Sequence, residues 1–139
     1  MKRILFLCTN NSTLSQMAEA FLKRITFNRV DVYSAGIKPR SVSPMGIRVM
    51  KELGIDISKN RSKSVNEFFH ERFDYVITID DNARQNSPTF QGSHTKIHKS
   101  LDDPADFKGT ESEKLETFRL TRDQIKDWLT DFAERYQLS

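Results

Sequence analysis

The chain has one cysteine and no long apolar run, and each of these features excludes some classes of protein. A single cysteine, Cys8, excludes an internal disulfide framework and fits a reducing compartment. The apolar run after Met1-Lys2-Arg3 ends at Cys8, whereas a signal peptide needs roughly 7–15 apolar residues. No stretch approaches transmembrane length. We therefore expect a cytoplasmic protein without a membrane partner.

The charge pattern also lacks a basic stripe with interleaved aromatic residues. The formal net charge is +3, and basic residues alternate with acidic ones throughout the chain. This pattern is typical of a solvated surface rather than a nucleic-acid interface. No repeat, linker or low-complexity block divides the 139 residues, and a chain of about 150 residues buries roughly 68–70% of its unfolded surface. We expect a single domain spanning 1–139.

The most informative stretch is the polar loop 8–15. It follows the apolar run Ile4-Leu5-Phe6-Leu7, which predicts a strand buried on both faces. It precedes a helix that begins near Ser15 and shows apolar residues at helical spacing: Leu14, Met17, Ala18, Phe21 and Ile25. Backbone N–H groups of such a turn, together with the helix dipole, favour anion binding. The same field should help Cys8 to ionise below the usual pKa of a thiol.

Other patterns place the loop in a sheet. They predict strands over 30–34, 75–79 and 96–98, and helices from Ser43-Pro44 to Gly54, from Ser64 with a capping box at Glu67, and over 111–136. Residues 80–92 are polar and irregular, with room for one helical turn. This alternation predicts an α/β fold, a four-stranded parallel sheet with helices on both faces. Ligands of such sheets bind at the carboxyl ends of the strands.

The loop resembles that of the low-molecular-weight protein tyrosine phosphatases and the related thiol-dependent arsenate reductases. Those families read Cys, five residues, Arg, then Ser or Thr, which Cys8 and Ser15 match. Leu14 stands where the arginine belongs, and Asn10 where a glycine is usual; asparagine tolerates the left-handed backbone that this glycine adopts. Further similar segments are 33–36, 53–56 and Asp103-Pro104. The resemblance implies a flavodoxin-like winding for nearly the whole chain.

The resemblance implies specific roles. Cys8 is the nucleophile that forms a phosphocysteine, and Asp103 is the general acid and then base. The oxyanion is held by the loop residues Thr9, Asn10, Asn11, Ser12, Thr13, Leu14 and Ser15. No cofactor or metal is implied. From the residues alone, Cys8 also fits a small buried residue at a strand end, and Asp103 an ordinary turn residue before proline.

Leu14 raises a question about activity. Arginine binds phosphate through two parallel N–H bonds and offsets its charge, and leucine does neither. Because Leu14 falls on the apolar stripe of the helix, we expect it to pack in the core. Arg40, Arg61 and Lys63 are candidates for a replacement cation, although a solvated surface position fits each of them as well.

Other chemistries have weaker support. The similar arsenate reductases that use thioredoxin pass a disulfide among three cysteines. With Cys8 alone this relay is impossible, and Asp80 and Ser87 stand in the region where the later two cysteines would fall. His94 and His98 are four residues apart but lie in strand-like sequence without a completing ligand, so we expect no zinc site. No motif supports a Cys–His protease.

The leading hypothesis is a divergent phosphatase that hydrolyses phosphomonoesters through Cys8 with an impaired loop. The alternative is a non-catalytic relative that binds an oxyanion or a phosphoprotein, and a third, weaker hypothesis is an arsenate reductase that uses an external thiol. The expected partners are phosphate or another oxyanion and a phosphotyrosine protein. Whether a cation replaces the missing arginine separates the first two hypotheses.

Overall fold

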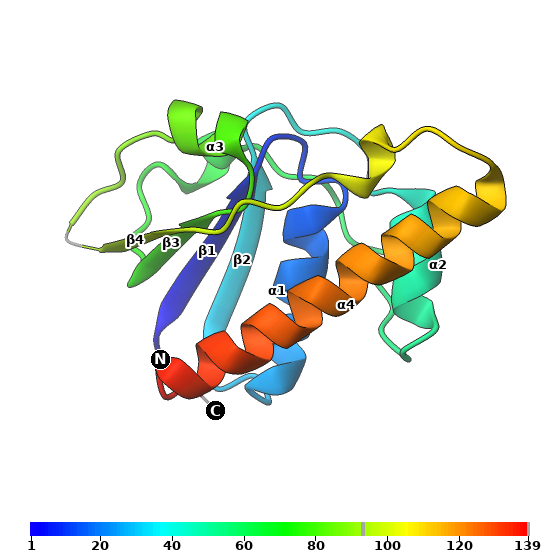
Figure 1. Cartoon of the computed structure of the whole chain (residues 1–139). Helices are drawn as coiled ribbons and strands as arrows, with labels where there is room; N and C mark the ends of the chain where they lie inside the picture. The colour runs from blue at the N-terminus through cyan, green and yellow to red at the C-terminus, as the bar shows by residue number, and fades with distance from the viewer. Residues whose placement is uncertain (93, 139) are drawn as a thin grey trace.

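The computed structural model describes residues 1–92 and 94–138, which form a parallel sheet covered by helices (Figure 1). The strands are β1 (Arg3–Cys8), β2 (Asp31–Gly36), β3 (Tyr75–Thr78) and β4 (Thr95–His98). They lie in the order β2-β1-β3-β4, and every neighbouring pair is parallel. The predicted four-stranded parallel sheet is confirmed.

The helices cover both faces of this sheet. The α-helices are α1 (Leu14–Ile25), α2 (Pro44–Lys51), α3 (Asp81–Asn86) and α4 (Glu111–Arg135), and the two 3₁₀ helices are η1 (Val65–Phe68) and η2 (Pro104–Asp106). Helices α1, α2 and α4 pack together on one side, and α4 runs diagonally across α1 in Figure 1. The strands point toward α3 and η2, so these short helices lie near the carboxyl edge of the sheet.

Strand β1 supplies the centre of two apolar clusters. Ile4 and Phe6 are fully buried on the side of α1 and α4, while Leu5 and Leu7 are fully buried against residues of η1 and α3. Successive side chains of a strand point to opposite faces, so a continuous apolar run is what a central strand requires. The prediction of a strand buried on both faces before Cys8 is therefore confirmed.

The irregular segment 80–92 contains more helix than the one turn expected. Residues 81–86 form helix α3, because the carboxylate of Asp80 accepts the Ala83 N–H at 2.7 Å and caps the helix. One local prediction was wrong. Ser64 caps η1, but the Glu67 carboxylate pairs with Arg61 rather than completing a capping box. No helix among the described residues is long and apolar enough to cross a membrane.

Candidate functional site

The loop 9–13 is held from outside by the segment that follows β2. The backbone carbonyls of Cys8, Thr9, Asn10 and Ser12 accept hydrogen bonds from the N–H groups of Ile37, Lys38, Arg40 and Ser43. Gly36 permits this close approach, since a Cβ atom there would lie 2.9 Å from backbone atoms of Thr9, Asn10 and Asn11. With these carbonyls bonded on the outside, the loop keeps one fixed shape.

Asn11 shapes the inner side of the loop. We had expected Asn10 to adopt the left-handed backbone. Instead, Asn11 adopts it, with φ 48°. Its buried amide donates to Ser15 Oγ at 2.7 Å and accepts from the backbone N–H of Lys63 at 2.8 Å and from Gln16 Nε2 at 3.0 Å. These bonds offset the cost of the left-handed backbone.

The Cys8 thiol lies at the base of this loop and is 3% exposed. Ser15 Oγ lies 2.8 Å from the sulfur, and the Asn11 N–H donates to it at 3.1 Å. Burial raises the pKa of the Cys8 thiol, and the hydrogen bonds from Ser15 and Asn11 offset this only in part. The expectation of an easily ionised thiol was therefore wrong, because we had not allowed for its burial.

Several donors of the loop have no partner among the described residues. The backbone N–H groups of Asn10, Ser12, Thr13 and Leu14 donate to none of them. The hydroxyl of Thr13, which directly precedes α1, is also buried and unbonded within 1–92 and 94–138. Four loop amides therefore lack internal partners at the positive end of a twelve-residue helix, and the Thr13 hydroxyl beside them is buried without a partner.

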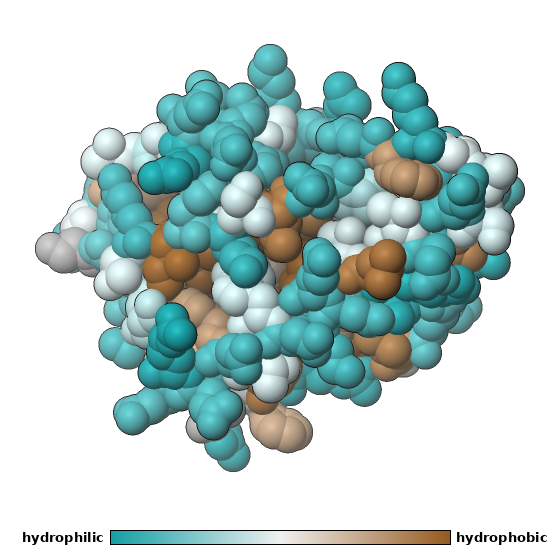
Figure 2. Space-filling model, in the orientation of Figure 1, coloured by the Kyte–Doolittle hydropathy of each residue, from teal (hydrophilic) through white to brown (hydrophobic). Residues whose placement is uncertain are grey.

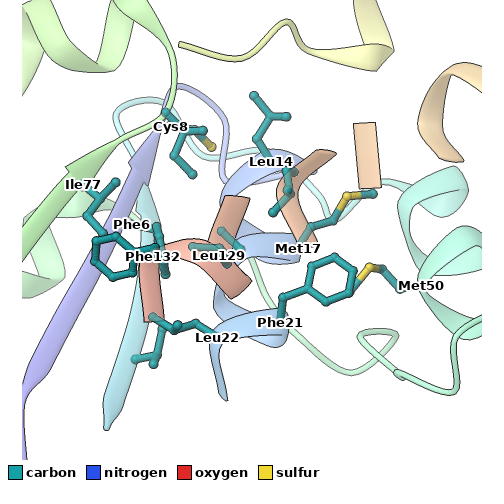
Figure 3. Close-up of a cluster of buried hydrophobic side chains, with 14 of the residues drawn as sticks. Phe6, Cys8, Leu14, Met17, Phe21, Leu22, Met50, Ile77, Leu129 and Phe132 are labelled. Carbon is teal, nitrogen blue, oxygen red and sulfur yellow. The ribbon is translucent and has the colours of Figure 1, made fainter. Parts of the chain in front are cut away.

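Leu14 packs in the core, as expected from its position on the helix. It is 1% exposed and lies with Cys8 at one end of the larger apolar cluster, above Met17 and Phe21 (Figure 3). The position that carries arginine in the similar families thus contributes an apolar side chain to the interior.

The three candidate cations are occupied elsewhere or exposed. Arg61 forms two hydrogen bonds with Glu67, at 2.7 and 3.0 Å. Lys63 Nζ lies 3.8 Å from Glu19 and 3.2 Å from the Arg61 carbonyl, and burial lowers its pKa. Arg40 is exposed and contacts the loop through its backbone. In the part of the chain that the structure describes, no lysine or arginine side chain bonds to residues 8–15.

Asp80 is a site residue that sequence reasoning missed. Its carboxylate accepts from the backbone N–H of Thr9 at 2.8 Å and from the Thr9 hydroxyl at 2.9 Å. One loop amide is therefore already bonded to an internal carboxylate. The signal was available: Asp80 follows the strand Tyr75–Thr78 at the same sheet edge as Cys8, and an acid there also fits a helix cap.

Asp103 lies near the same edge. It is half-buried, and its carboxylate accepts the Ala105 N–H at 2.9 Å. Burial raises the pKa of Asp103, with smaller contributions from the charges of Asp106 and Asp80. Asp80 also contributes to the raised pKa of Cys8, so its charge acts on both predicted catalytic groups. A carboxyl that holds its proton more tightly suits a general acid.

The remaining candidates form no second site. Asp80 and Ser87, which stand near the cysteine positions of a relay, flank the two ends of α3. His98 bonds to Thr78 at 2.7 Å and to Asp81 at 3.1 Å, whereas His94 precedes β4 and lies near the Gly92 carbonyl. Within 1–92 and 94–138, no three His, Cys, Asp or Glu side chains are grouped as metal ligands.

Comparisons with known proteins agree with this geometry. The family model "low molecular weight phosphotyrosine protein phosphatase" matches residues 3–138. An arsenate reductase of Halalkalibacterium halodurans is 41% identical over 133 residues, which cover 96% of each chain. The solved structure of an arsenate reductase in the phosphate binding state has a TM-score of 0.82 at 31% identity, over 97% of this chain and 98% of that one. The tyrosine phosphatase Wzb from Escherichia coli K30 shares the fold, with a TM-score of 0.79 at 18% identity over 97% and 98% of the chains.

Proposed function

Because this chain belongs to the low molecular weight phosphotyrosine protein phosphatase family, we propose that it binds oxyanions at the loop 8–15 while the cysteine chemistry is suppressed. One observation carries the proposal: Leu14 is buried in the core, and no described cationic side chain bonds to the loop. The loop therefore keeps its backbone donors and lacks the charge that phosphoryl transfer requires.

The suppression has an electrostatic cause. Losing one preorganised donor costs about 2.7–4 kcal/mol of transition-state stabilisation, and a cationic clamp on a phosphoryl group is worth about 10³–10⁵ in rate. The thiol must also ionise before it attacks, and burial with the nearby Asp80 raises its pKa. The missing cation and the raised pKa both disfavour a reaction that places a dianionic substrate next to a thiolate.

Binding has better support than turnover. The amides of Asn10, Ser12, Thr13 and Leu14 have no internal partner, and hydrogen bonds to the carbonyls of the loop hold its backbone without a ligand. Such donors at the N-terminus of a helix suit phosphate and related tetrahedral anions. A protein carrying phosphotyrosine is the corresponding macromolecular partner, and the single reduced cysteine fits the cytoplasm.

The test compares binding with turnover. Phosphate, sulfate or arsenate at millimolar concentration should slow the alkylation of Cys8 by iodoacetamide. Hydrolysis of p-nitrophenyl phosphate should at the same time be indistinguishable between the wild type and Cys8→Ser. If the oxyanions leave the alkylation rate unchanged, the loop does not bind them. If the wild type hydrolyses the substrate at the rate of an ordinary phosphatase and Cys8→Ser does not, the suppression is refuted.

A slow phosphatase is the second candidate, because the raised pKa of Asp103 suits proton donation to a leaving oxygen. In that mechanism, Cys8 sulfur attacks phosphorus, Asp103 protonates the leaving alcohol, and water then displaces the phosphate from sulfur. A low turnover that is lost in both Cys8→Ser and Asp103→Asn would favour this candidate.

The relatives named arsenate reductase suggest a third reaction, which this chain cannot complete alone. Cys8 would attack arsenate and release water, and an external thiol would attack the Cys8 sulfur and release arsenite. A second external thiol would then reduce the mixed disulfide, so the two electrons come from two added thiols. Arsenite formation with glutathione that requires Cys8 would support this route.

A further inference from the structure

A trough separates helix α4 from the segment that links β4 to η2. Its volume is about 730 Å³, and Leu101, Leu120 and Trp128 line its apolar part. Leu120 is 59% exposed, which is unusual for a large apolar side chain on the helix that packs against the core. Figure 2 shows apolar side chains in this region surrounded by hydrophilic ones. The trough is open at the surface and distinct from the loop that holds Cys8.

The same trough carries an excess of negative charge. Asp102, Asp127 and Asp131 line it, and none of them forms an ion pair with a residue in 1–92 or 94–138. Lys99 is the one basic residue in its lining. The chain as a whole has a formal net charge of +3, so this acidic surface is local. A complementary partner is therefore positively charged.

Lys99 shows how a cation fits beside the aromatic ring. Its ammonium nitrogen lies 6.0 Å from the centroid of the Trp128 ring, at the limit of a cation–π contact. Asp127 and Asp131 line the same trough as this ring, so it offers an incoming ammonium or guanidinium group both an aromatic face and unpaired carboxylates. Arginine suits this arrangement because its planar group both stacks and binds carboxylates.

We propose that this trough docks a basic, partly apolar segment of another protein, independently of what the loop binds. Basic side chains of the segment face Asp102, Asp127 and Asp131, and its apolar side chains cover Leu120. The exposed leucine favours a protein segment over a small polyamine, which has no apolar side chain to place there.

Trp128 is the sole tryptophan of the chain, so its fluorescence reports directly on the trough. The probe is a capped nine-residue peptide that alternates arginine and leucine, and its control replaces every arginine with glutamate. We expect the arginine peptide alone to shift the emission saturably, with weaker binding as salt rises. Asp127→Asn with Asp131→Asn should weaken binding about 10-fold, or about 3-fold for each charge. Glu134→Gln, an exposed acid of α4 outside the trough lining, should leave the affinity unchanged.

Three results would overturn the proposal. The first is no saturable shift with the arginine peptide, or an equal affinity of that peptide for the wild type and the double variant. The second is a spermine affinity equal to that of the peptide, which would indicate a site for cations only. The third is self-association in sedimentation that displaces the peptide, which would assign the trough to a second copy. Phosphate should not compete with the peptide, so a failed peptide titration leaves the oxyanion proposal intact.

Discussion

Replacing Leu14 with arginine restores the one charged group that the loop lacks. Cys8, Asn11 and Ser15 already form a connected hydrogen-bond network, and Asp103 lies near the same sheet edge with a raised pKa. We expect Leu14→Arg to raise hydrolysis of p-nitrophenyl phosphate about 100-fold or more above the rate of the wild type, and this gain should depend on Cys8. The gain should stay below the increase in rate of about 10³–10⁵ that a cationic clamp on a phosphoryl group provides, because Asp80 remains as a competing partner for the guanidinium.

The same substitution should destabilise the fold. Leu14 is 1% exposed, and withdrawing its buried side chain costs about 1.5–3 kcal/mol, which the alkyl part of arginine offsets in part. We expect a net loss of about 1–3 kcal/mol, measured by urea unfolding, and a fall in Tm of about 4–12 °C. Leu14→Met conserves the volume and adds no charge, so it should retain stability and gain no activity.

Two further variants control this experiment. Leu14→Lys supplies a charge without the bidentate geometry and should give a smaller gain than arginine. Cys8→Ser combined with Leu14→Arg must be inactive, which excludes a contaminating phosphatase. The reasoning is refuted if Leu14→Arg folds, binds phosphate more tightly than the wild type and shows no Cys8-dependent turnover.

Other predictions concern the charged groups around the loop. In the Leu14→Arg background, Asp103→Asn should slow the hydrolysis of phenyl phosphate more than that of p-nitrophenyl phosphate. A substitution of the exposed Asp102 by Asn should show no such difference, and equal effects of the two variants would mean that Asp103 is not the general acid. Asp80→Asn should lower the pKa of Cys8, seen as faster alkylation at neutral pH, and unchanged kinetics would contradict this. Because folding raises the pKa of Cys8, the unfolded chain loses that proton first. Its contribution to stability should be full at low pH and fall as pH rises through the folded-state pKa, a trend that Cys8→Ala should lack in urea unfolding. Lys63→Met should lower the free energy of unfolding in urea by about 1–2 kcal/mol, because it leaves the mostly buried carboxylate of Glu19 with one partner fewer. An unchanged free energy of unfolding would mean that the Lys63–Glu19 pair is not stabilising.

The sequence was sufficient for the sheet and for the packing of Leu14. Apolar runs and helical spacing reflect burial on a strand or helix face, and this property is local to each element. The boundaries of β1, β3 and α4 lie within one or two residues of those expected. The order of the strands agrees with the flavodoxin-like winding that the family resemblance implies, whereas the alternation alone predicts only that the strands are parallel.

The electrostatics of the site could not be obtained in this way. The direction of the Cys8 pKa depends on whether burial outweighs the hydrogen bonds, and burial is set by several elements together. The place of Lys63 depends on Glu19, which lies far away in sequence but beside it in the fold. Asp80 likewise contacts Thr9 across the sheet edge. Such pairings require the tertiary structure.

A phosphate titration of the ¹⁵N-labelled wild type, followed by NMR, tests the central claim most directly. We expect saturable shifts of the amide signals of Asn10, Ser12, Thr13 and Leu14, with the α4 amides unaffected. Cys8→Ser should give the same pattern, since the donors are backbone groups. Loop amides that do not move up to tens of millimolar phosphate, or shifts confined to exposed lysines and arginines, would contradict an oxyanion site at this loop.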